Sequence, residues 1–504
     1  MVFLRGRELV ISVAYRCRNR RCRDARRGRI HTSRAAERLT VRGSSFALEV
    51  IVQIGYWRFW KRWTVAQIHE VLSQERCVPI AEREVLYLIG VFLVLSRCTY
   101  HLRWIEHATE FRRQGLFLAI NALKPEKGNR ALYVVRELKH GLVVHHVSLL
   151  NTDQRVLENR LLQPLKGLDY RIRGLVSDDE KALRLAIAHV LPAVPHQTCQ
   201  VHCLRDAALP IVNADRTFKT ALKKAIRAPF YAAARVLEAL AADDPCATVL
   251  QSYADLIRST LTEDSKPPFA LGGLRVFEDL ARLDASLRRS REKGGIRCSR
   301  SYSRWCSVAN RSARYRQLKC QRSWLLELER RLDPPEGEGQ PRPTRRHIQQ
   351  RITEFLAQLA QHAQDHPADA AVVAHITQTF EQRWPRLFAC YAWPERYRTN
   401  NELETFFGRL RTRQRQIHGR KAVHEFVTRY GEWAIYLDPT ESCEQLLQRL
   451  QQFDQDTFDR EYDRFLHTQK RLQLLYRFRH WPRRCLKALE QQWAEAIHRK
   501  PQRG

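Results

Sequence analysis

The feature that most constrains the fold is a change of hydrophobic spacing near residue 115. Before it, apolar residues recur at helical spacing, and after it they gather in short runs typical of strands. Three such runs cover residues 116–123, 131–138 and 142–150. The sequence Pro-Glu-Lys-Gly-Asn at 125–129 is typical of a hairpin connection, and a helix is expected over 153–162. This pattern predicts three antiparallel strands followed by a helix.

A fourth apolar run, residues 172–176, stops abruptly at the sequence Ser-Asp-Asp of residues 177–179. A carboxylate at the end of a strand lies at the carboxyl edge of a sheet, where open α/β folds place their chemistry. The alternative is that Asp178 and Asp179 only cap the helix expected next. After a Pro-x-x-Pro break, a last strand is expected over 197–202.

The resulting order of three strands, helix, strand, helix and strand is that of an RNase H-like fold, an α/β core with a mixed five-stranded sheet. The first and fourth strands of such a sheet are neighbours, so we expect Asn121 and Asp178 to lie side by side. Nearly all of the chain from about residue 204 to 388 then has the pattern of helices. The boundaries, which also use the family resemblance described below, are 111–207 for the first part of the core, 208–390 for a large all-helical insertion, 391–435 for the closing part of the core and 436–504 for a helical C-terminal region.

Two further regions precede the core. Residues 1–45 are rich in arginine and irregular, which predicts a basic arm. Within it, Cys17 and Cys22 could form half of a zinc site, but zinc takes four ligands and no second pair is nearby, so zinc binding stays open. Short helices over 46–110 indicate a helix-turn-helix-like DNA-binding domain whose last helix would enter the major groove. Because residues 85–95 are very apolar for such a helix, a purely structural bundle is the alternative.

A second polar stretch covers residues 398–421. Asn400 or Asn401 can cap a helix whose first turn carries Glu402 and Glu404. The basic residues that follow are Arg409, Arg411, Arg413, Arg415, Arg420 and Lys421. One interpretation is a DNA-binding helix. The alternative is a solvated helix with acids at its N-terminus and bases at its C-terminus, as the helix dipole favours.

The charge balance indicates the class of partner. The chain has 504 residues, with 87 Lys and Arg against 54 Asp and Glu, a net charge of +33. Such a charge favours a polyanion such as nucleic acid, although a general basic bias in composition is the alternative. The 13 scattered cysteines indicate reduced thiols. No signal peptide is evident, and no uninterrupted apolar run reaches the roughly 18 residues that span a bilayer. We expect a cytoplasmic, nucleoid-associated protein with no membrane contact.

Three separated segments of the chain resemble DDE transposases of the Mutator-like (MULE) superfamily. They are residues 118–128, the Asp178 stretch with Cys199-x-x-His202, and the stretch Thr-Asn-Asn-x-x-Glu that ends at Glu404. The resemblance covers roughly residues 115–435. It implies an RNase H-like catalytic domain with a long helical insertion between the second aspartate and the glutamate.

The resemblance also implies residue roles. Asp178 corresponds to the second catalytic acid and Glu404 to the third, with Glu402 as the rival for the last position. Cys199 and His202 match a C-x-x-H motif near the active site, with an implied structural or supporting role. The metal ligands are expected to be Asp178 and Glu404.

The first acid is where this chain departs from the family. The family has an aspartate in the pattern Ala-Ile-Asp-Gly, and this chain has Asn121 in Ala-Ile-Asn-Ala. In the implied mechanism two Mg²⁺ ions flank the scissile phosphate, and a carboxylate that bridges them supplies charge that a neutral amide lacks. Glu126, in the hairpin turn, is not expected to replace it. The two-metal site is therefore expected to be incomplete and catalysis impaired.

Three functions are compatible with these residues. An active transposase would carry out Mg²⁺-dependent strand cleavage and strand transfer, and a degenerate one would still bind transposon-end DNA. The third is a non-enzymatic nucleic-acid-binding protein on an RNase H-like scaffold, so whether the chain is an enzyme stays open. The implied partners are double-stranded DNA, as transposon ends and target, and further copies of the chain in a homo-oligomer. The N-terminal helices would recognise the ends, while the arginines after Glu404 and the basic segment 288–316 would contact phosphates.

Overall fold

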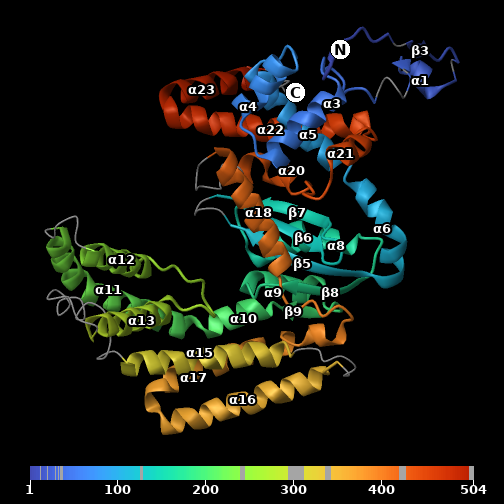
Figure 1. Cartoon of the computed structure of the whole chain (residues 1–504). Helices are drawn as coiled ribbons and strands as arrows, with labels where there is room; N and C mark the ends of the chain where they lie inside the picture. Colours follow the sequence, from blue (N-terminus) through green and yellow to red (C-terminus); the bar gives the residue numbers. More distant parts are fainter. Residues whose placement is uncertain are drawn as a thin grey trace. The chain divides into compact units, whose positions relative to one another are not determined.

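The structure is a computed structural model that describes most of the chain. The described residues are 1–11, 13–19, 21–28, 30–31, 33, 38–124, 129–238, 245–292, 312–334, 342–418 and 427–498. They divide into two compact units. Unit 1 comprises Met1–Arg173, Ala182–Pro192 and Asn401–Gly504, and unit 2 comprises Gly174–Lys181 and Ala193–Asn400. Figure 1 shows the course of the chain within each unit.

The predicted strands are present. In unit 1, β5 (Leu116–Leu123), β6 (Ala131–Glu137) and β7 (Val143–Leu149) form antiparallel pairs, with Asn121 opposite Val134. In unit 2, the end of β8 (Ile172–Ser177) runs parallel to β9 (His196–Thr198). The complete strand order is β7-β6-β5-β8-β9, which confirms the mixed five-stranded sheet and the adjacency of the first and fourth strands. The connection at 125–128, with Glu126, lies outside the described residues.

The predicted strand over 197–202 is wrong beyond Thr198. The chain leaves β9 at Cys199 and turns into the helix α10 (Gln200–Ala207), so His202 is helical. The helix begins when the N–H of Cys203 donates to the carbonyl of Cys199. The buried residues Cys203, Leu204 and Ala207 have the spacing of a helix face, a signal that the six-residue window hid.

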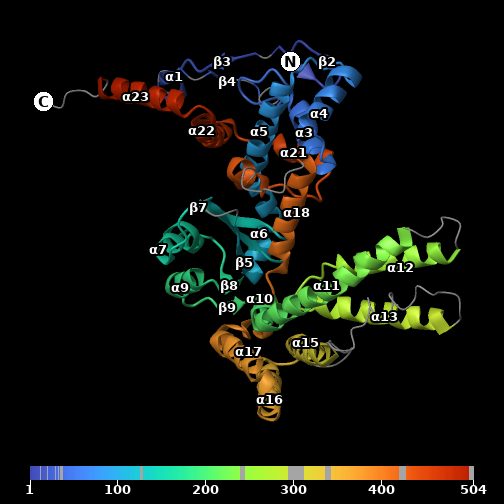
Figure 2. The ribbon, with the colours of Figure 1, turned by 90° about the vertical axis from the view of Figure 1, so that its left-hand side faces the viewer.

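Unit 1 also contains a helical part built around α5 (Glu82–Cys98). Figure 2 shows α5 beside α3 and α22, and the three helices pack together. The crossing of α3 and α5 is close, because a Cβ atom on Gly55 would lie 2.2 Å from the ring of Phe92. The predicted N-cap at Thr64 is confirmed by a capping box with Gln67. The surrounding elements are α3 (Leu48–Tyr56), η1 (Trp57–Lys61), α4 (Val65–Glu70), η2 (Val71–Glu75), α6 (His101–Gln114), α20 (Glu432–Ala434), α21 (Cys443–Leu450), α22 (Gln455–His480) and α23 (Pro482–His498).

Burial decides between the two interpretations of α5. Every residue from Leu88 to Ser96 is buried, so this part of the helix fills the core of unit 1 and cannot lie in a DNA groove. This favours the structural bundle for α5. Among the described residues, the continuous helical stretch Glu82–Gln114 is long and apolar enough to cross a membrane by length and composition. However, 72% of its most apolar window is buried inside the structure, as in the core helix of a soluble protein.

Short elements complete unit 1. They are β1 (Val2–Phe3), β2 (Gly6–Arg7), β3 (Tyr15–Arg16), α1 (Arg23–Arg26), β4 (Ile30–His31), α7 (Gln154–Leu157), η3 (Glu158–Leu162), α8 (Gln163–Lys166), most of α9 (Lys181–Val190), α18 (Asn401–His418) and η8 (Val427–Gly431). The predicted helix over 153–162 corresponds to α7 and η3. Cys17 and Cys22 lie in the arm, half-buried, with both thiols free of disulfides.

Unit 2 is helical apart from the end of β8 and the strand β9. Figure 1 shows the long helices α11, α12 and α13 as one group and α15, α16 and α17 as a second. The Asp215 carboxylate fixes the start of α13 by accepting the N–H groups of Gly273 and Leu274, at 2.8 and 3.0 Å. The bounds are α11 (Leu209–Glu238), α12 (Pro245–Leu261), α13 (Gly272–Glu292), α15 (Ser312–Leu332), α16 (Arg345–Asp365), η5 (Pro367–Asp369), α17 (Ala370–Arg383), η6 (Trp384–Arg386) and η7 (Ala389–Ala392). Of the basic segment 288–316, residues 293–311 lie outside the described residues.

Candidate functional site

The two acids after β8 have different surroundings in unit 2. Asp179 pairs with Arg383 at 3.4 Å and with Arg386 at 3.5 Å, and Arg383 also pairs with Asp206 at 2.5 Å. The side chains of Asp179 and Arg383 are each 11% exposed, so this cluster is largely shielded from water. Asp178 is half-buried at the end of the strand. Asp179 therefore has a structural role in unit 2. The acid that the resemblance identifies as catalytic is its neighbour, Asp178.

Cys199 joins two backbone segments that are far apart in the sequence. Its N–H donates to the carbonyl of Ser177, directly before Asp178, at 2.8 Å. Its Sγ accepts the N–H of Asn400 at 3.2 Å, and the neighbouring N–H of Gln200 donates to the carbonyl of Arg398 at 3.0 Å. Cys199 is fully buried. A buried sulfur atom thus fixes the segment that leads directly into the helix of Glu404.

His202 lies on α10, half-buried, one turn after Cys199. The glutamines beside the motif bind the chain that follows α17. Gln197 donates to the carbonyl of Leu387 at 2.8 Å and accepts the N–H of Cys390 at 2.9 Å, and Gln200 donates to the Leu387 carbonyl at 3.1 Å. Cys199 and Gln200 of the C-x-x-H motif are therefore part of the core of unit 2, whereas His202 is half-buried.

In unit 1, α18 carries the other candidate acids. Leu403, Phe407 and Leu410 form its buried face, and α18 packs on β5. Each residue of an α-helix turns by about 100°, so Glu402 and Glu404, two residues apart, point to opposite sides of α18. Their environments must therefore differ.

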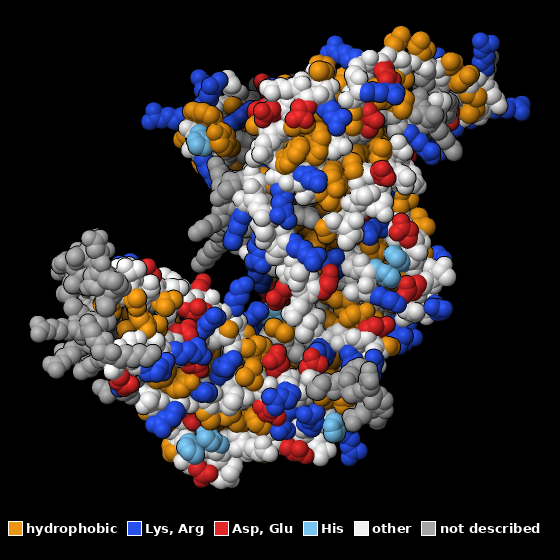
Figure 3. Space-filling model, viewed as in Figure 1, with side chains coloured by type: hydrophobic (Ala, Val, Ile, Leu, Met, Phe, Trp, Pro, Cys, Tyr) orange, Lys and Arg blue, Asp and Glu red, His pale blue; other side chains and the backbone are white. Residues whose placement is uncertain are grey.

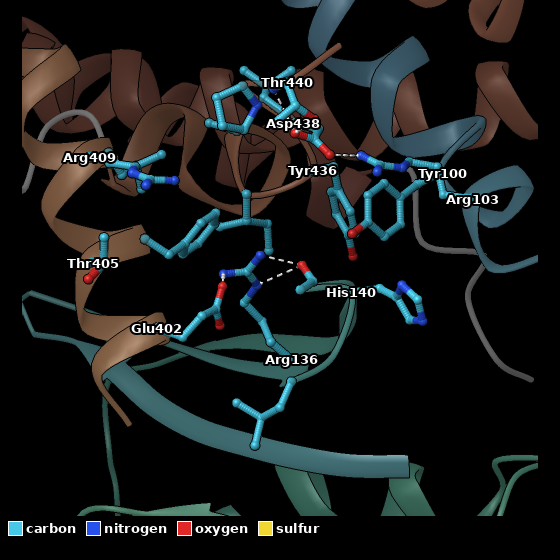
Figure 4. Close-up of a pocket in the computed structure, with 18 of the residues that line it drawn as sticks. Tyr100, Arg103, Arg136, His140, Glu402, Thr405, Arg409, Tyr436, Asp438 and Thr440 are labelled. Carbon is cyan, nitrogen blue, oxygen red and sulfur yellow. Dashed lines mark hydrogen bonds and ion pairs between the residues drawn. The ribbon is translucent and has the colours of Figure 1, made fainter. Parts of the chain in front are cut away.

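Glu402 lines a cavity of about 490 Å³ in unit 1. Figure 4 shows Arg136 of β6 extending toward it, with an ion pair of 2.6 Å. Arg136 also donates to the carbonyl of Gly141 and lies over the ring of Phe406 at 4.3 Å. Although 43% of the Glu402 side chain is exposed, burial against the cavity wall raises the pKa of its carboxyl, an effect that Arg136 offsets only in part.

The upper wall of the cavity is aromatic and charged. The rings of Tyr100 and Tyr436 meet at 4.7 Å, and Arg103 pairs with Asp438 (Figure 4). Burial raises the pKa of Tyr436 to about 12, so its hydroxyl remains protonated at neutral pH. The cavity can accept a polar or charged group, and most of its cations already have an acidic partner.

The basic side chains of α18 that the structure describes are exposed. Arg411 and Arg415, one turn apart, are exposed, and so is Arg409, which lies on the cavity rim. Arg413 belongs to α18 but its side chain lies outside the described ones, as do Arg420 and Lys421 entirely. Figure 3 shows Lys and Arg side chains spread over the face that it displays, including the part of unit 1 that contains α18.

One segment of the chain matches a known protein family. Residues 155–263 match the family described as Transposase, Mutator family. This segment resembles a Mutator-family transposase. It contains Asp178, Cys199 and His202, whereas Asn121 and Glu404 lie outside it. Among curated proteins, none matches this chain.

Asn121 is fixed within β5 of unit 1. It is 9% exposed, and its Oδ1 accepts the N–H of Ala122 at 2.7 Å. The amide oxygen is thus already used by the backbone, and it carries no charge. Carboxylates such as Asp178 and Glu404 are ligands that Mg²⁺ prefers, but a neutral oxygen engaged in a hydrogen bond is a poor bridge between two cations. Asn121 therefore does not fit the bridging role that the resemblance implies for this position.

The sequence did not predict the arginines that bind Asp179 and Glu402. Arg136, Arg383 and Arg386 lie far in sequence from Glu402 and Asp179, so no local pattern links them. It also missed the contact between Cys199 and Asn400. One local signal was available for Arg383. It lies at the end of the helix predicted over 369–384, directly before the sequence Trp-Pro.

Proposed function

We propose that this chain is a transposase-like DNA-binding protein with an RNase H-like core and a DDE-type site that is incomplete at Asn121. The observation that carries the proposal is the Mutator-family match over residues 155–263, which includes Asp178 and the C-x-x-H motif in the order that the sequence resemblance requires. The strand order β7-β6-β5-β8-β9 supports the RNase H-like core, because consecutive numbering makes it 3-2-1-4-5. The protein would act on DNA in the cytoplasm, as a homo-oligomer.

The choice of Asp178 and Glu404 rests on the resemblance, because they stand at the positions that its motifs give to the second and third acids. Their neighbours have contacts with arginine: Asp179 is bound by Arg383 and Arg386, and Glu402 by Arg136. The site would bind Mg²⁺ through Asp178 and Glu404, and the ion would activate the attacking oxygen of water or of a 3′-hydroxyl. Cys199 would hold the entry to the Glu404 helix.

Asn121 determines the level of activity in this proposal. Since the first position lacks a carboxylate, strand cleavage and strand transfer would be impaired, while DNA binding would persist. The net charge of +33 supports DNA binding with a strong dependence on salt. The exposed Arg411 and Arg415 would contact phosphates. Replacing both by alanine should reduce the slope of log affinity against log salt by about 2.

The deciding experiment is a cleavage and strand-transfer assay on DNA that carries the element's own ends, with Mg²⁺ or Mn²⁺. It compares the native chain with Asn121→Asp and with Asn121→Asp combined with Glu404→Ala. We expect DNA binding by all three proteins, cleavage by Asn121→Asp, and no cleavage when Glu404 is also replaced. Binding measured at two salt concentrations is the control for folding and DNA contact.

Three other outcomes are informative. Cleavage by the native chain would show that another group completes the metal site and that Asn121 is tolerated. Binding without cleavage in all variants would favour the non-enzymatic nucleic-acid-binding protein. If the folded native chain did not bind DNA, the proposed DNA-binding function would be wrong.

A further inference from the structure

A second group of metal-ligand side chains lies in unit 1, away from the DDE candidates. His107 and Glu110 are three residues apart on α6, so they share one face of the helix. His140 lies in the turn between β6 and β7 and meets that face. Of the described residues, these three bring one ligand atom each to within 4.8 Å of the others. All three side chains are half-buried.

The three side chains lie close together. The rings of His107 and His140 are stacked at 3.8 Å with an angle of 18°. The Oε2 atom of Glu110 lies 2.9 Å from Nε2 of His140. Donor atoms around a tetrahedral zinc ion are about 3.3 Å apart, given metal–ligand bonds of roughly 2.0–2.1 Å. Because imidazole lone pairs lie in the ring plane, the two stacked rings would tilt to face one ion, which would replace the hydrogen bond between Glu110 and His140.

The surrounding residues hold the three side chains in position. The buried carboxylate of Glu137 accepts the N–H groups of Lys139 and His140, each at 2.7 Å, and so fixes the turn. Lys139 binds Oε1 of Glu110 at 2.5 Å, on the other side of that carboxylate. The ring of Phe111 packs against His140 at 5.6 Å. Contacts of this kind orient ligands, and the Lys139 ammonium leaves Oε2 of Glu110 as the oxygen that faces His140.

We propose that His107, Glu110 and His140 form a binding site for a transition-metal ion of the Zn²⁺ class. Two imidazole nitrogens and one carboxylate oxygen suit zinc, cobalt or nickel, whereas Mg²⁺ prefers oxygen ligands alone. A water molecule would take the fourth position.

The ion would act as a clip between α6 and the β6–β7 turn. The same turn carries Gly141, whose carbonyl accepts from Arg136 at 2.9 Å. Arg136 in turn binds Glu402 in the cavity of unit 1. The site would therefore strengthen one wall of that cavity. It is independent of Mg²⁺ and of DNA cleavage, so its failure would leave the proposed function untouched.

The test is Co²⁺ and Zn²⁺ titration of the full-length protein, kept reduced and freed of metal. The chain has 19 histidines and 13 cysteines, so a difference between variants is the meaningful result. We expect one site that His140→Gln and Glu110→Gln each weaken by about 10-fold or more. The matched control is His69→Gln, a half-buried histidine on α4, which should titrate like the native chain. Far-ultraviolet circular dichroism verifies that each variant is folded.

The ligands can also be identified directly. X-ray absorption of the complex with one equivalent of Zn²⁺ should show nitrogen and oxygen neighbours with imidazole scattering. Sulfur in the first coordination shell would assign the ion to cysteines and overturn the proposal. The same conclusion would follow if native protein, His140→Gln and His69→Gln bound Zn²⁺ equally. Zn²⁺ should raise the melting temperature of the native chain and of His69→Gln by the same amount, and raise that of Glu110→Gln less at the same Zn²⁺ concentration.

Discussion

Each unit contains a pair of closely spaced candidate acids, and the arginine contacts of Asp179 and Glu402 lie in different surroundings. In unit 2 the neighbour of Asp178 is Asp179, which two arginines bind in a largely buried cluster. In unit 1 the neighbour of Glu404 is Glu402, which one arginine binds at the edge of a cavity. Burial raises the pKa of Glu402 despite Arg136, so there the cost of burying a charge outweighs the ion pair.

This difference indicates the structural roles of Asp179 and Glu402. The Asp179 cluster holds unit 2 together, because its loss would leave two arginines poorly compensated. The Glu402 pair orders the cavity wall of unit 1 but adds little stability in its charged form. The arginines that bind Asp179 and Glu402 are distant in sequence, so the spacing of the acids could not predict these contacts.

The largest expected effect separates catalytic acids from their neighbours. In the Asn121→Asp background, Asp178→Asn and Glu404→Gln should each reduce DNA cleavage by roughly 10²–10³-fold or more, because each removes an anionic ligand of the Mg²⁺ that the reaction would require. Asp179→Asn and Glu402→Gln should retain most of the activity at a temperature where they are folded. A cleavage time course measures all four. A complete loss with Glu402→Gln and none with Glu404→Gln would make Glu402 the third acid.

The second effect concerns stability rather than activity. Asp179→Asn should lower the free energy of unfolding by about 2 kcal/mol, because it removes the charge that pairs with both Arg383 and Arg386 in a shielded site. Urea denaturation of the full chain measures this. The control is Asp279→Asn, whose exposed pair with Arg282 should contribute less than about 0.5 kcal/mol. Equal effects of the two substitutions would contradict the anchoring role of Asp179.

The third effect tests the link between the two segments that Cys199 joins. Cys199→Ala should cost about 1–2 kcal/mol, since the buried N–H of Asn400 loses its acceptor. Hydrogen exchange at the Asn400 amide should become faster, with little change elsewhere in unit 2. Cys320→Ala, at an exposed thiol on α15, is the control. Unchanged exchange at Asn400 would mean that the sulfur does not hold this segment.

The sequence predicted the strands and helices well where periodicity is strong. The runs 116–123 and 131–138 nearly coincide with β5 and β6, and Thr64 caps α4 as expected. The error at Cys199 arose because a three-residue strand passes directly into a helix, so a short apolar window fits both. The burial of α5 follows from its packing against α3 and α22, which come from opposite ends of the chain.

The candidate site was only partly predictable. The resemblance selected Asp178, Glu404 and Asn121, but the partners that distinguish each acid from its neighbour are long-range. Arg136 lies on a strand far from Glu402, and His140 lies 30 positions from Glu110. In the metal-ligand group, the spacing His-x-x-Glu on α6 was a local signal, and the third ligand depends on the course of the β6–β7 turn.

The smallest expected effect is a pH dependence that arises from Glu402. Its pKa is raised above the ordinary value of 4.5, so the folded chain holds this proton more tightly than the unfolded chain. The resulting stabilisation is complete below the unfolded pKa and is lost as the pH rises through the higher pKa of the folded state. Glu402→Gln is neutral throughout and avoids this loss.

The stability of Glu402→Gln relative to the native chain should therefore increase between pH 4 and pH 7. Urea denaturation at several pH values measures the difference, in which the other titrating groups cancel. Arg136→Gln should produce a larger rise in the pKa of Glu402 and hence a steeper loss of stability over the same range. A relative stability that falls as the pH rises would mean that Arg136 outweighs burial. Glu402 would then be held like Asp179, and the contrast between the two units would disappear.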